Sequence, residues 1–324
     1  MSNSNLELSR NPSIDQFRGF SILLMVLANY LAGIQIIPAW LKHTPDIGLT
    51  VIDLIAPSFI FVIGLTYGLS WKKRILIHGR LRTYQHFFTR FMAIIGIGAV
   101  LSAGEIWLQV DGATINWGVL QSIGAAGVLT LIVINMPTSW RAMISICLLA
   151  AYQYMVDTSW LASILQAPHG GLPGSISWGA MLILATVLAD CFHDAANRKF
   201  FFPLSLLILV LGIGSAFLIP VSKNRVSFSY VLISLGISAL IFFVMDWLEK
   251  QGNLHSVLFT AWGKNPLILY ILHLLLLGIV FLPGIPEWYS NAPPYLIFLQ
   301  IFGLTGILSG IAFWLEKKNI LFSL

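Results

Sequence analysis

Residues 29–64 read NYLAGIQIIPAWLKHTPDIGLTVIDLIAPSFIFVIG, two apolar runs joined by a short, more polar segment. A helix needs about 20 mostly apolar residues to cross the hydrocarbon core of a bilayer, so each run predicts part of one membrane span. Within this apolar sequence stand an amide, an imidazole and a carboxylate, from Asn29, His43 and Asp53. The stretch therefore predicts a helical hairpin in a membrane, with polar side chains gathered near its turn.

The composition of the whole chain agrees with a membrane protein. Of 324 residues, 57% are hydrophobic and 10% are charged, and the mean hydropathy is +0.85. A soluble domain carries roughly 25% charged residues, so no soluble domain is expected. The net charge of +5 does not indicate nucleic acid as a partner, because the basic residues lie in short loops between apolar runs, as in membrane topology signals. The two cysteines imply no disulfide framework.

Ten apolar segments of sufficient length follow one another along the chain, separated mainly by Pro- and Gly-containing joints. They predict an all-α polytopic membrane protein, a bundle of about ten transmembrane helices. A short amino-terminal segment over 1–16 precedes the transmembrane domain over 17–315, and a tail over 316–324 follows it. The expected spans are 17–37, 48–71, 87–108, 115–135, 138–157, 174–193, 200–220, 227–247, 263–282 and 294–315.

The basic residues predict the orientation of the bundle. Ten spans place both termini on one side of the membrane. If that side is the cytoplasm, all 18 Lys and Arg residues lie at cytoplasmic ends except Lys42, Lys223 and Arg225. Cytoplasmic loops carry an excess of Lys and Arg, so both termini are expected to be cytoplasmic. We expect a multi-pass protein of a bacterial inner membrane.

The most basic segment is WKKRILIHGRLRTYQHFFTR, residues 71–90. At a cytoplasmic boundary it predicts a topology anchor, or an interfacial helix lying on anionic lipid. A patch that receives a phosphorylated ligand from the cytoplasm is the alternative.

The polar residues of the opening stretch predict a catalytic site near the outer surface. Ionisable side chains inside a membrane usually face a cavity and mark function. A histidine beside a carboxylate is a recurrent general-base arrangement, so His43 and Asp53 are assigned these roles. Asn29 is assigned to the stabilisation of developing charge. The structural alternatives are helix-to-helix hydrogen bonding for Asn29, a solvated loop for His43 and a structural pair for Asp53.

A second polar group is expected at the cytoplasmic mouth and is assigned to binding of a phosphorylated donor. Lys264 and Asn265 stand before Pro266 at a helix start, where exposed N–H groups and the helix dipole favour anions. Arg18 lies at the same depth in the first span. Gln121 is assigned to the same donor, with helix packing as its alternative. No metal site is expected, since the histidines are scattered without ligand spacing.

Several motifs together resemble one family. The segments DQFRGFSILLMVLANY and KHTPDIGLTVIDLIAPSFIFVIG, followed in order by WGVLQSIG, PVSKNRVSFSYVL and GKNPLILYILH, are similar to the heparan-alpha-glucosaminide N-acetyltransferase family. The resemblance implies transfer of acetyl from cytoplasmic acetyl-CoA to a glucosamine amine across the membrane. It places the active-site histidine at His43 and its partner asparagine at Asn29.

The sequence therefore predicts a transmembrane acyltransferase whose partners are acetyl-CoA, an amino-sugar or glycan acceptor and the lipid bilayer. Direct transfer and an acetyl-His43 intermediate both remain open. Two other functions remain as alternatives, an O-acyltransferase of surface glycans and a proton-coupled secondary transporter. The role of His273, and whether the protein forms a homodimer, are also left open.

Overall fold

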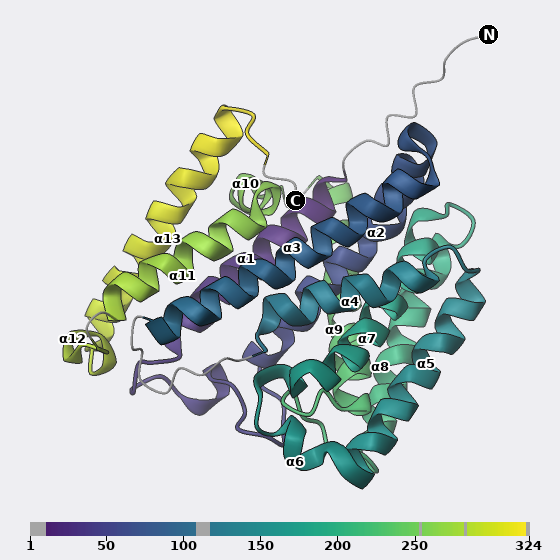
Figure 1. The fold of residues 1–324 in the computed structure, drawn as a ribbon. Coiled ribbons are helices and arrows are strands. Elements are labelled where there is room, and N and C mark those ends of the chain that lie inside the picture. The colour runs from purple at the N-terminus through teal and green to yellow at the C-terminus, as the bar shows by residue number, and fades with distance from the viewer. Residues whose placement is uncertain (1–10, 108–116, 253–254, 282–283, 322–324) are drawn as a thin grey trace.

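The computed structural model describes residues 11–107, 117–252, 255–281 and 284–321. Over these residues the chain is helical, and the only sheet-like pairing is an isolated bridge between Ile47 and Ser222. Figure 1 shows the longer helices lying side by side as a bundle. The α-helices are α1 (Pro12–Leu31), α2 (Ile55–His78), α3 (Arg80–Trp107), α4 (Val119–Val133), α5 (Thr138–Met155), α6 (Leu161–Ile164), α7 (Gly171–His193), α8 (Phe201–Ser215), α9 (Phe228–Lys250), α10 (Val257–Lys264), α11 (Pro266–Phe281), α12 (Glu287–Ser290) and α13 (Pro294–Lys317).

The prediction of an all-α membrane protein is confirmed, and each expected span overlaps one of the longer helices. By length and composition, six helical segments in the described part of the chain could cross a membrane. A seventh is the pair α10 and α11, if the two count as one span despite a bend of 88° between them. α4, with 15 residues, is shorter than a full crossing. The count of ten spans therefore stays a prediction.

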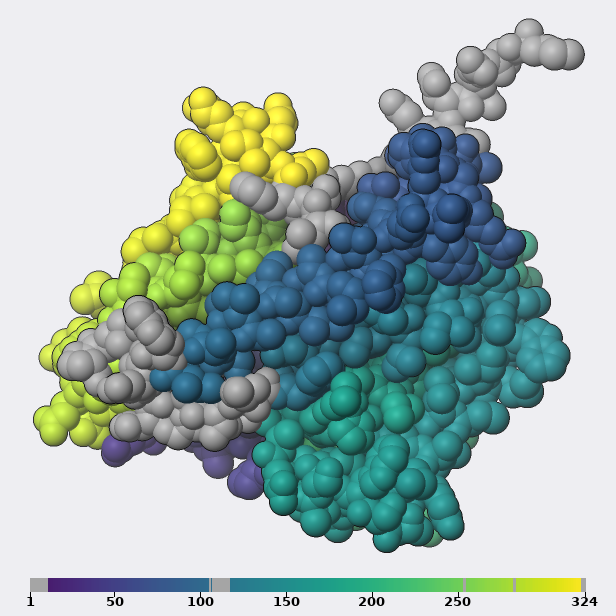
Figure 2. Space-filling view, in the orientation of Figure 1, coloured from purple at the N-terminus to yellow at the C-terminus, as the bar shows by residue number. Residues whose placement is uncertain are grey.

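α7 is the central helix of the bundle. It packs against α2, α4 and α5. In its apolar 18-residue stretch 78% of the residues are buried, whereas in the corresponding stretches of α3, α8 and α13 only 22% are buried. α3 crosses the face shown in Figure 2. Its exposed Val100, like the exposed Phe302 of α13, suits contact with lipid, because an apolar side chain has no reason to avoid hydrocarbon.

The two ends of the bundle carry different features. The start of α1 and the end of α13 lie at one end, towards the top of Figure 1, and the loop that follows α1 lies at the other. α1 begins at Pro12, earlier than the expected boundary at residue 17, because Asn11 caps it and accepts a hydrogen bond from the Ser13 backbone N–H. Pro12 suits the first helical position, where no N–H is needed.

The basic segment 71–90 is helical on both sides of a single joint. α2 continues to His78 and α3 starts at Arg80, with Gly79 between them at φ +76°. A positive φ of this kind favours glycine, which has no Cβ atom to clash. The segment thus forms the ends of two long helices that meet at the α2–α3 turn.

Glycines set the crossing between α1 and α10. A Cβ atom added at Gly263 would meet the backbone carbonyl of Asp15, and one added at Gly19 would meet the carbonyl of Phe259. Small residues that let two helix backbones approach closely are a common device of membrane helix packing. This close crossing holds the bend before α11 against the first helix.

We expect Gly263→Ala to destabilise the protein by at least about 1–3 kcal/mol, because the added methyl group overpacks a backbone contact that cannot move aside. The measurement is the midpoint of thermal unfolding in detergent. Gly303→Ala is the matched control, since a Cβ atom there meets nothing within 4 Å and alanine is the better helix former. Equal midpoints for the two variants would contradict the crossing described here.

Candidate functional site

The site is built around the carboxylate of Asp53. This residue lies in the short 3-10 turn Ile52–Leu54 that leads into α2, and its side chain is fully buried. Its Oδ2 atom accepts hydrogen bonds from the hydroxyls of Thr44 (2.8 Å) and Thr50 (3.0 Å), and from their backbone N–H groups at 3.3 and 3.1 Å. The loop between α1 and α2 therefore folds onto one charged group.

His43 is oriented by the other carboxylate oxygen. Its Nδ1 lies 2.8 Å from Asp53 Oδ1. An ionised carboxylate only accepts hydrogen bonds, so Nδ1 carries the proton and donates it, which leaves Nε2 as the basic nitrogen. The His43 side chain is 45% exposed, so a molecule from outside can reach the ring. The pair has the geometry of a general base whose ring is oriented by a carboxylate.

Lys223 approaches the same carboxylate from a distant part of the sequence. Its Nζ lies 3.9 Å from Asp53 Oδ1, and the residue is only 7% exposed. Burial lowers the pKa of Lys223 to about 8, and the negative charge of Asp53 opposes that shift. Asp53 is thus shared between an imidazole and a buried ammonium group.

A second loop holds Lys223 in place. The segment between α8 and α9 pairs with the α1–α2 loop through the bridge between Ile47 and Ser222. Asp46 accepts hydrogen bonds from Ser222 Oγ (2.8 Å) and from Arg225 Nε (2.9 Å). The Arg225 guanidinium lowers the pKa of the Asp46 carboxyl, so this ion pair persists well below neutral pH.

Asn29 reaches the site from the last turn of α1. Its Nδ2 lies 2.9 Å from Nε2 of His273 on α11, and His273 is fully buried. His273, whose role the sequence left open, thus contacts α1. The contact ties the orientation of the Asn29 amide to α11.

One cavity collects the three residues assigned to catalysis. Its wall combines the end of α1, the start of α2, the first residue of α4, one residue of α11 and three loops. The lining residues are Met25, Ala28, Asn29, His43, Ile52, Asp53, Ile55, Ala56, Val119, His169, Lys223 and Tyr270. Residues far apart in the sequence therefore line one small cavity, in which apolar walls surround a few polar groups.

Three of the four residues assigned to the donor lie together at the opposite end of α1. Arg18 Nη1 contacts the Gly263 carbonyl (3.2 Å) and Asp15 Oδ1 (3.0 Å). Lys264 is paired with Glu316, and Asn265 Nδ2 donates to the Ile320 carbonyl (3.0 Å). These polar groups meet where α1, α10 and α13 come together.

Gln121 lies apart from that group. It is buried in the first turns of α4, on the same helix end that contributes Val119 to the cavity. Its side-chain oxygen lies where a Cβ atom of Gly98 on α3 would be. The structure thus places Gln121 in helix packing near the His43 chamber.

The sequence reasoning missed two residues of the chamber, His169 and Lys223. His169 stands in a non-helical turn at φ +56°, and nothing in its local sequence marks it. Lys223 did carry a signal, because it lies in the quoted motif PVSKNRVSFSYVL and is one of only three basic residues expected outside.

In the described part of the chain, no group of three or more His, Cys, Asp or Glu side chains could hold a metal ion, and the absence of a metal stays a prediction.

Comparison with known proteins shows which family the chain belongs to. Residues 10–173, just over half of the chain, match the family described as heparan-alpha-glucosaminide N-acetyltransferase, catalytic. The chain belongs to this family. The matched region contains Asn29, His43, Asp53 and His169, while Lys223 and His273 lie beyond it.

Curated relatives match over a shorter stretch. The chain is 34% identical to the human heparan-alpha-glucosaminide N-acetyltransferase over 121 residues, and 33% identical to the mouse protein over 120 residues. These stretches cover 35% and 34% of this chain and 17% of either relative. Most of each relative therefore lies outside the comparison.

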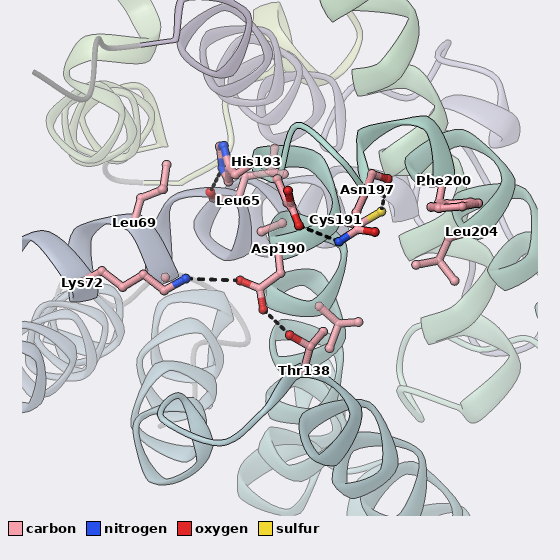
Figure 3. Close-up of a pocket in the computed structure, with 14 residues that line it drawn as sticks. Leu65, Leu69, Lys72, Thr138, Asp190, Cys191, His193, Asn197, Phe200 and Leu204 are labelled. Atoms are coloured by element: carbon pink, nitrogen blue, oxygen red, sulfur yellow. Dashed lines mark hydrogen bonds and ion pairs between the residues drawn. The ribbon is translucent and has the colours of Figure 1, made fainter. Parts of the chain in front are cut away.

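This family member has a second, larger cavity, shown in Figure 3, at the far end of α2. Asp190 accepts a hydrogen bond from Thr138 Oγ1 (2.7 Å) and faces Lys72 at 4.0 Å. His193 Nε2 contacts the Leu65 carbonyl (2.8 Å). The polar groups named here are thus paired within the second cavity. None of the residues that line this cavity belongs to the His43 chamber.

We expect Asp53→Asn to lower the midpoint of thermal unfolding, because the amide presents a donor to the donors of the loop and leaves Lys223 without its counter-charge. Breaking a buried ion pair costs about 3–5 kcal/mol in proteins. The measurement is unfolding in detergent, with the exposed Glu287→Gln as control. A loss no larger than that of the control would show that the loop does not depend on this carboxylate.

Proposed function

We propose that this protein is an integral membrane N-acetyltransferase that moves acetyl from cytoplasmic acetyl-CoA to the amine of an amino sugar on the opposite side of the membrane. The observation that carries the proposal is the His43–Asp53 pair in one chamber with Asn29, inside the region that matches the family. The acceptor class follows the glucosaminide named in the relatives.

The proposed topology has ten spans, with both termini in the cytoplasm. The start of α1 and the end of α13 share one end of the bundle (Figure 1), as an even number of crossings requires. The bias of Lys and Arg towards that end supports its assignment to the cytoplasm. The His43 chamber then opens near the outer surface.

In this arrangement the donor enters at the cytoplasmic mouth, its phosphates near Arg18, Lys264 and Asn265 at the start of α11. Phosphate groups favour such cations and the positive end of a helix. The cations are paired with Asp15 and Glu316, so a phosphate shares or replaces an existing acid. Arg18 and Asn29 are separated by about 16 Å along α1, at 1.5 Å per residue, a distance that an extended pantetheine arm can bridge.

The chemistry proposed for the chamber is general-base acyl transfer. His43 Nε2 takes a proton from the acceptor amine as its nitrogen attacks the thioester carbonyl carbon. Asp53 holds the ring through Nδ1 and stabilises the imidazolium that forms. Asn29 donates to the carbonyl oxygen as negative charge develops there. His43 then returns the proton to the departing CoA thiolate.

A two-step variant passes through acetyl-His43. Here Nε2 itself attacks the thioester, CoA leaves first, and the amine then takes the acetyl group from the imidazole. Acid quenching of the protein after incubation with radiolabelled acetyl-CoA alone distinguishes the two routes. Label retained on wild type and absent from His43→Ala supports the two-step route.

We expect purified protein to release CoA from acetyl-CoA only when glucosamine is present, and His43→Ala to lose at least about 10²-fold in kcat, the usual contribution of a positioned base. The measurement follows the CoA thiol in detergent solution. His255→Ala is the matched control. This exposed histidine lies between the end of α9 and the start of α10, where it pairs with Glu249, away from the chamber.

Two outcomes would count against the proposal. Binding of acetyl-CoA without CoA release would show that the acceptor is wrong, and a screen of glycan hydroxyls would follow. A protein that neither binds nor consumes acetyl-CoA is not an acetyltransferase.

A further inference from the structure

The inference in this subsection rests on the proposed acetyl transfer and concerns a group that the transfer still lacks. When an amine adds to a thioester, negative charge develops on the carbonyl oxygen, and oxyanion holes usually supply more than one donor. In the orientation that the structure gives, one N–H bond of the Asn29 amide is directed at His273. Asn29 then has a single N–H bond left for the reacting oxygen.

Lys223 has the unused donors. Its ammonium group carries three N–H bonds and lines the same chamber as Asn29 and His43. Its separation from Asp53, 3.9 Å, is longer than a hydrogen bond. No described residue accepts a hydrogen bond from Nζ, although Lys223 is only 7% exposed.

A buried ammonium group with unused donors is costly to maintain. Among the described residues, Asp53 is the acid that reduces this cost. The backbone on either side of Lys223 is held in place. The Val226 carbonyl accepts from Ser177 Oγ (2.7 Å), and Ser222 and Arg225 hold Asp46. A cation fixed in place before any ligand arrives is what electrostatic catalysis requires.

We propose that Lys223 is a further catalytic residue, whose ammonium group donates a hydrogen bond to the thioester carbonyl oxygen and stabilises the oxyanion as the amine adds. The nitrogen–carbon bond forms while the carbonyl π electrons move to that oxygen. Collapse of the adduct restores the carbonyl and breaks the carbon–sulfur bond. His43 carries the amine proton to the CoA sulfur, so Lys223 gives up no proton in the cycle.

The charged groups around Lys223 set its pH dependence. Asp53 lies at 3.9 Å, His43 and His169 line the same chamber, and Asp46 is paired with Arg225 in the adjoining loops. Because burial lowers the pKa of Lys223 to about 8, the ammonium form is present at neutral pH and is lost above that value. The kcat of wild type is therefore expected to fall as pH rises through about 8.

The test is the kinetics of Lys223→Met and Lys223→Arg with acetyl-CoA and glucosamine. Removal of one oxyanion donor lowers kcat by about 10²–10³-fold, so Lys223→Met is expected to lose that much below about pH 8, with little change in either KM. Above that pH the difference from wild type is expected to shrink, because wild-type Lys223 itself loses its charge. Lys223→Arg keeps a cation and donors, and is expected to recover part of kcat without the alkaline fall. Lys42→Met is the matched control, since Lys42 lies beside His43 in the α1–α2 loop but does not line the chamber.

Chemical rescue separates the loss of a charge from a loss of folding. Lys223→Cys treated with 2-bromoethylamine regains an ammonium group at the same reach, and its kcat is expected to rise at least about tenfold, a recovery of 1.4 kcal/mol. Wild type receives the same treatment, because Cys147 is exposed. Acetyl-CoA binding and the unfolding midpoint of each variant establish that it is folded.

Three results would overturn the inference. A rise in the KM for glucosamine alone, with kcat intact, would make Lys223 an acceptor-binding group. A loss confined to acidic pH and absent at neutral pH, where wild-type Lys223 is still charged, would mean that Lys223 acts through Asp53 and His43. Unchanged kinetics in folded Lys223→Met would remove it from the reaction. If wild type itself releases no CoA, the proposed function fails, whatever the variants do.

Discussion

The buried carboxylate of Asp53 is the interaction on which the site depends. A charge removed from water is tolerated only when hydrogen bonds and opposite charges replace the lost hydration. The protein supplies both, through Thr44 and Thr50 on one oxygen and His43 and Lys223 at the other. The carboxylate therefore sets the path of the α1–α2 loop and the proton position on His43. It also compensates the charge of an ammonium group from the α8–α9 loop.

The bilayer explains why polar groups gather at the two ends of the bundle. Between the His43 chamber and the far end of α2 the packing is apolar, with Ile60, Phe61 and Val62 essentially unexposed. Hydrocarbon offers no hydrogen bonds, so a polar group in this middle layer needs a partner inside the protein. Under the proposed function, a long donor that enters at one end and reacts at the other matches such a division.

The close crossing of α1 and α10 lies at one end of the bundle and is linked to the other end through α1 and α11. Gly19 and Gly263 let the backbones meet, and the chain then bends by 88° into α11. α11 runs alongside α1 in the same direction and brings His273 to Asn29. A rigid contact at the mouth therefore affects the orientation of an amide in the chamber, because both are joined by the same pair of helices.

The sequence by itself determined the class of fold and the residues at the centre of the site. Apolar runs of membrane-spanning length lead to helices, since only a helix satisfies its own backbone within a single segment. Asn29, His43 and Asp53 were identifiable because polar side chains are costly in membrane-spanning sequence and usually mark a functional site. Their closeness also followed from the short hairpin, in which sequence neighbours are neighbours in space.

Only the tertiary structure decided the rest of the chamber. Lys223 and His169 line it from segments distant in sequence, and His273 contacts its Asn29 from another. No local pattern states which loop pairs with which. The bend before α11 and the glycine crossing likewise depend on the shape of another helix. Local physics specifies spans and turns, whereas contacts between distant segments follow from how complete surfaces fit together.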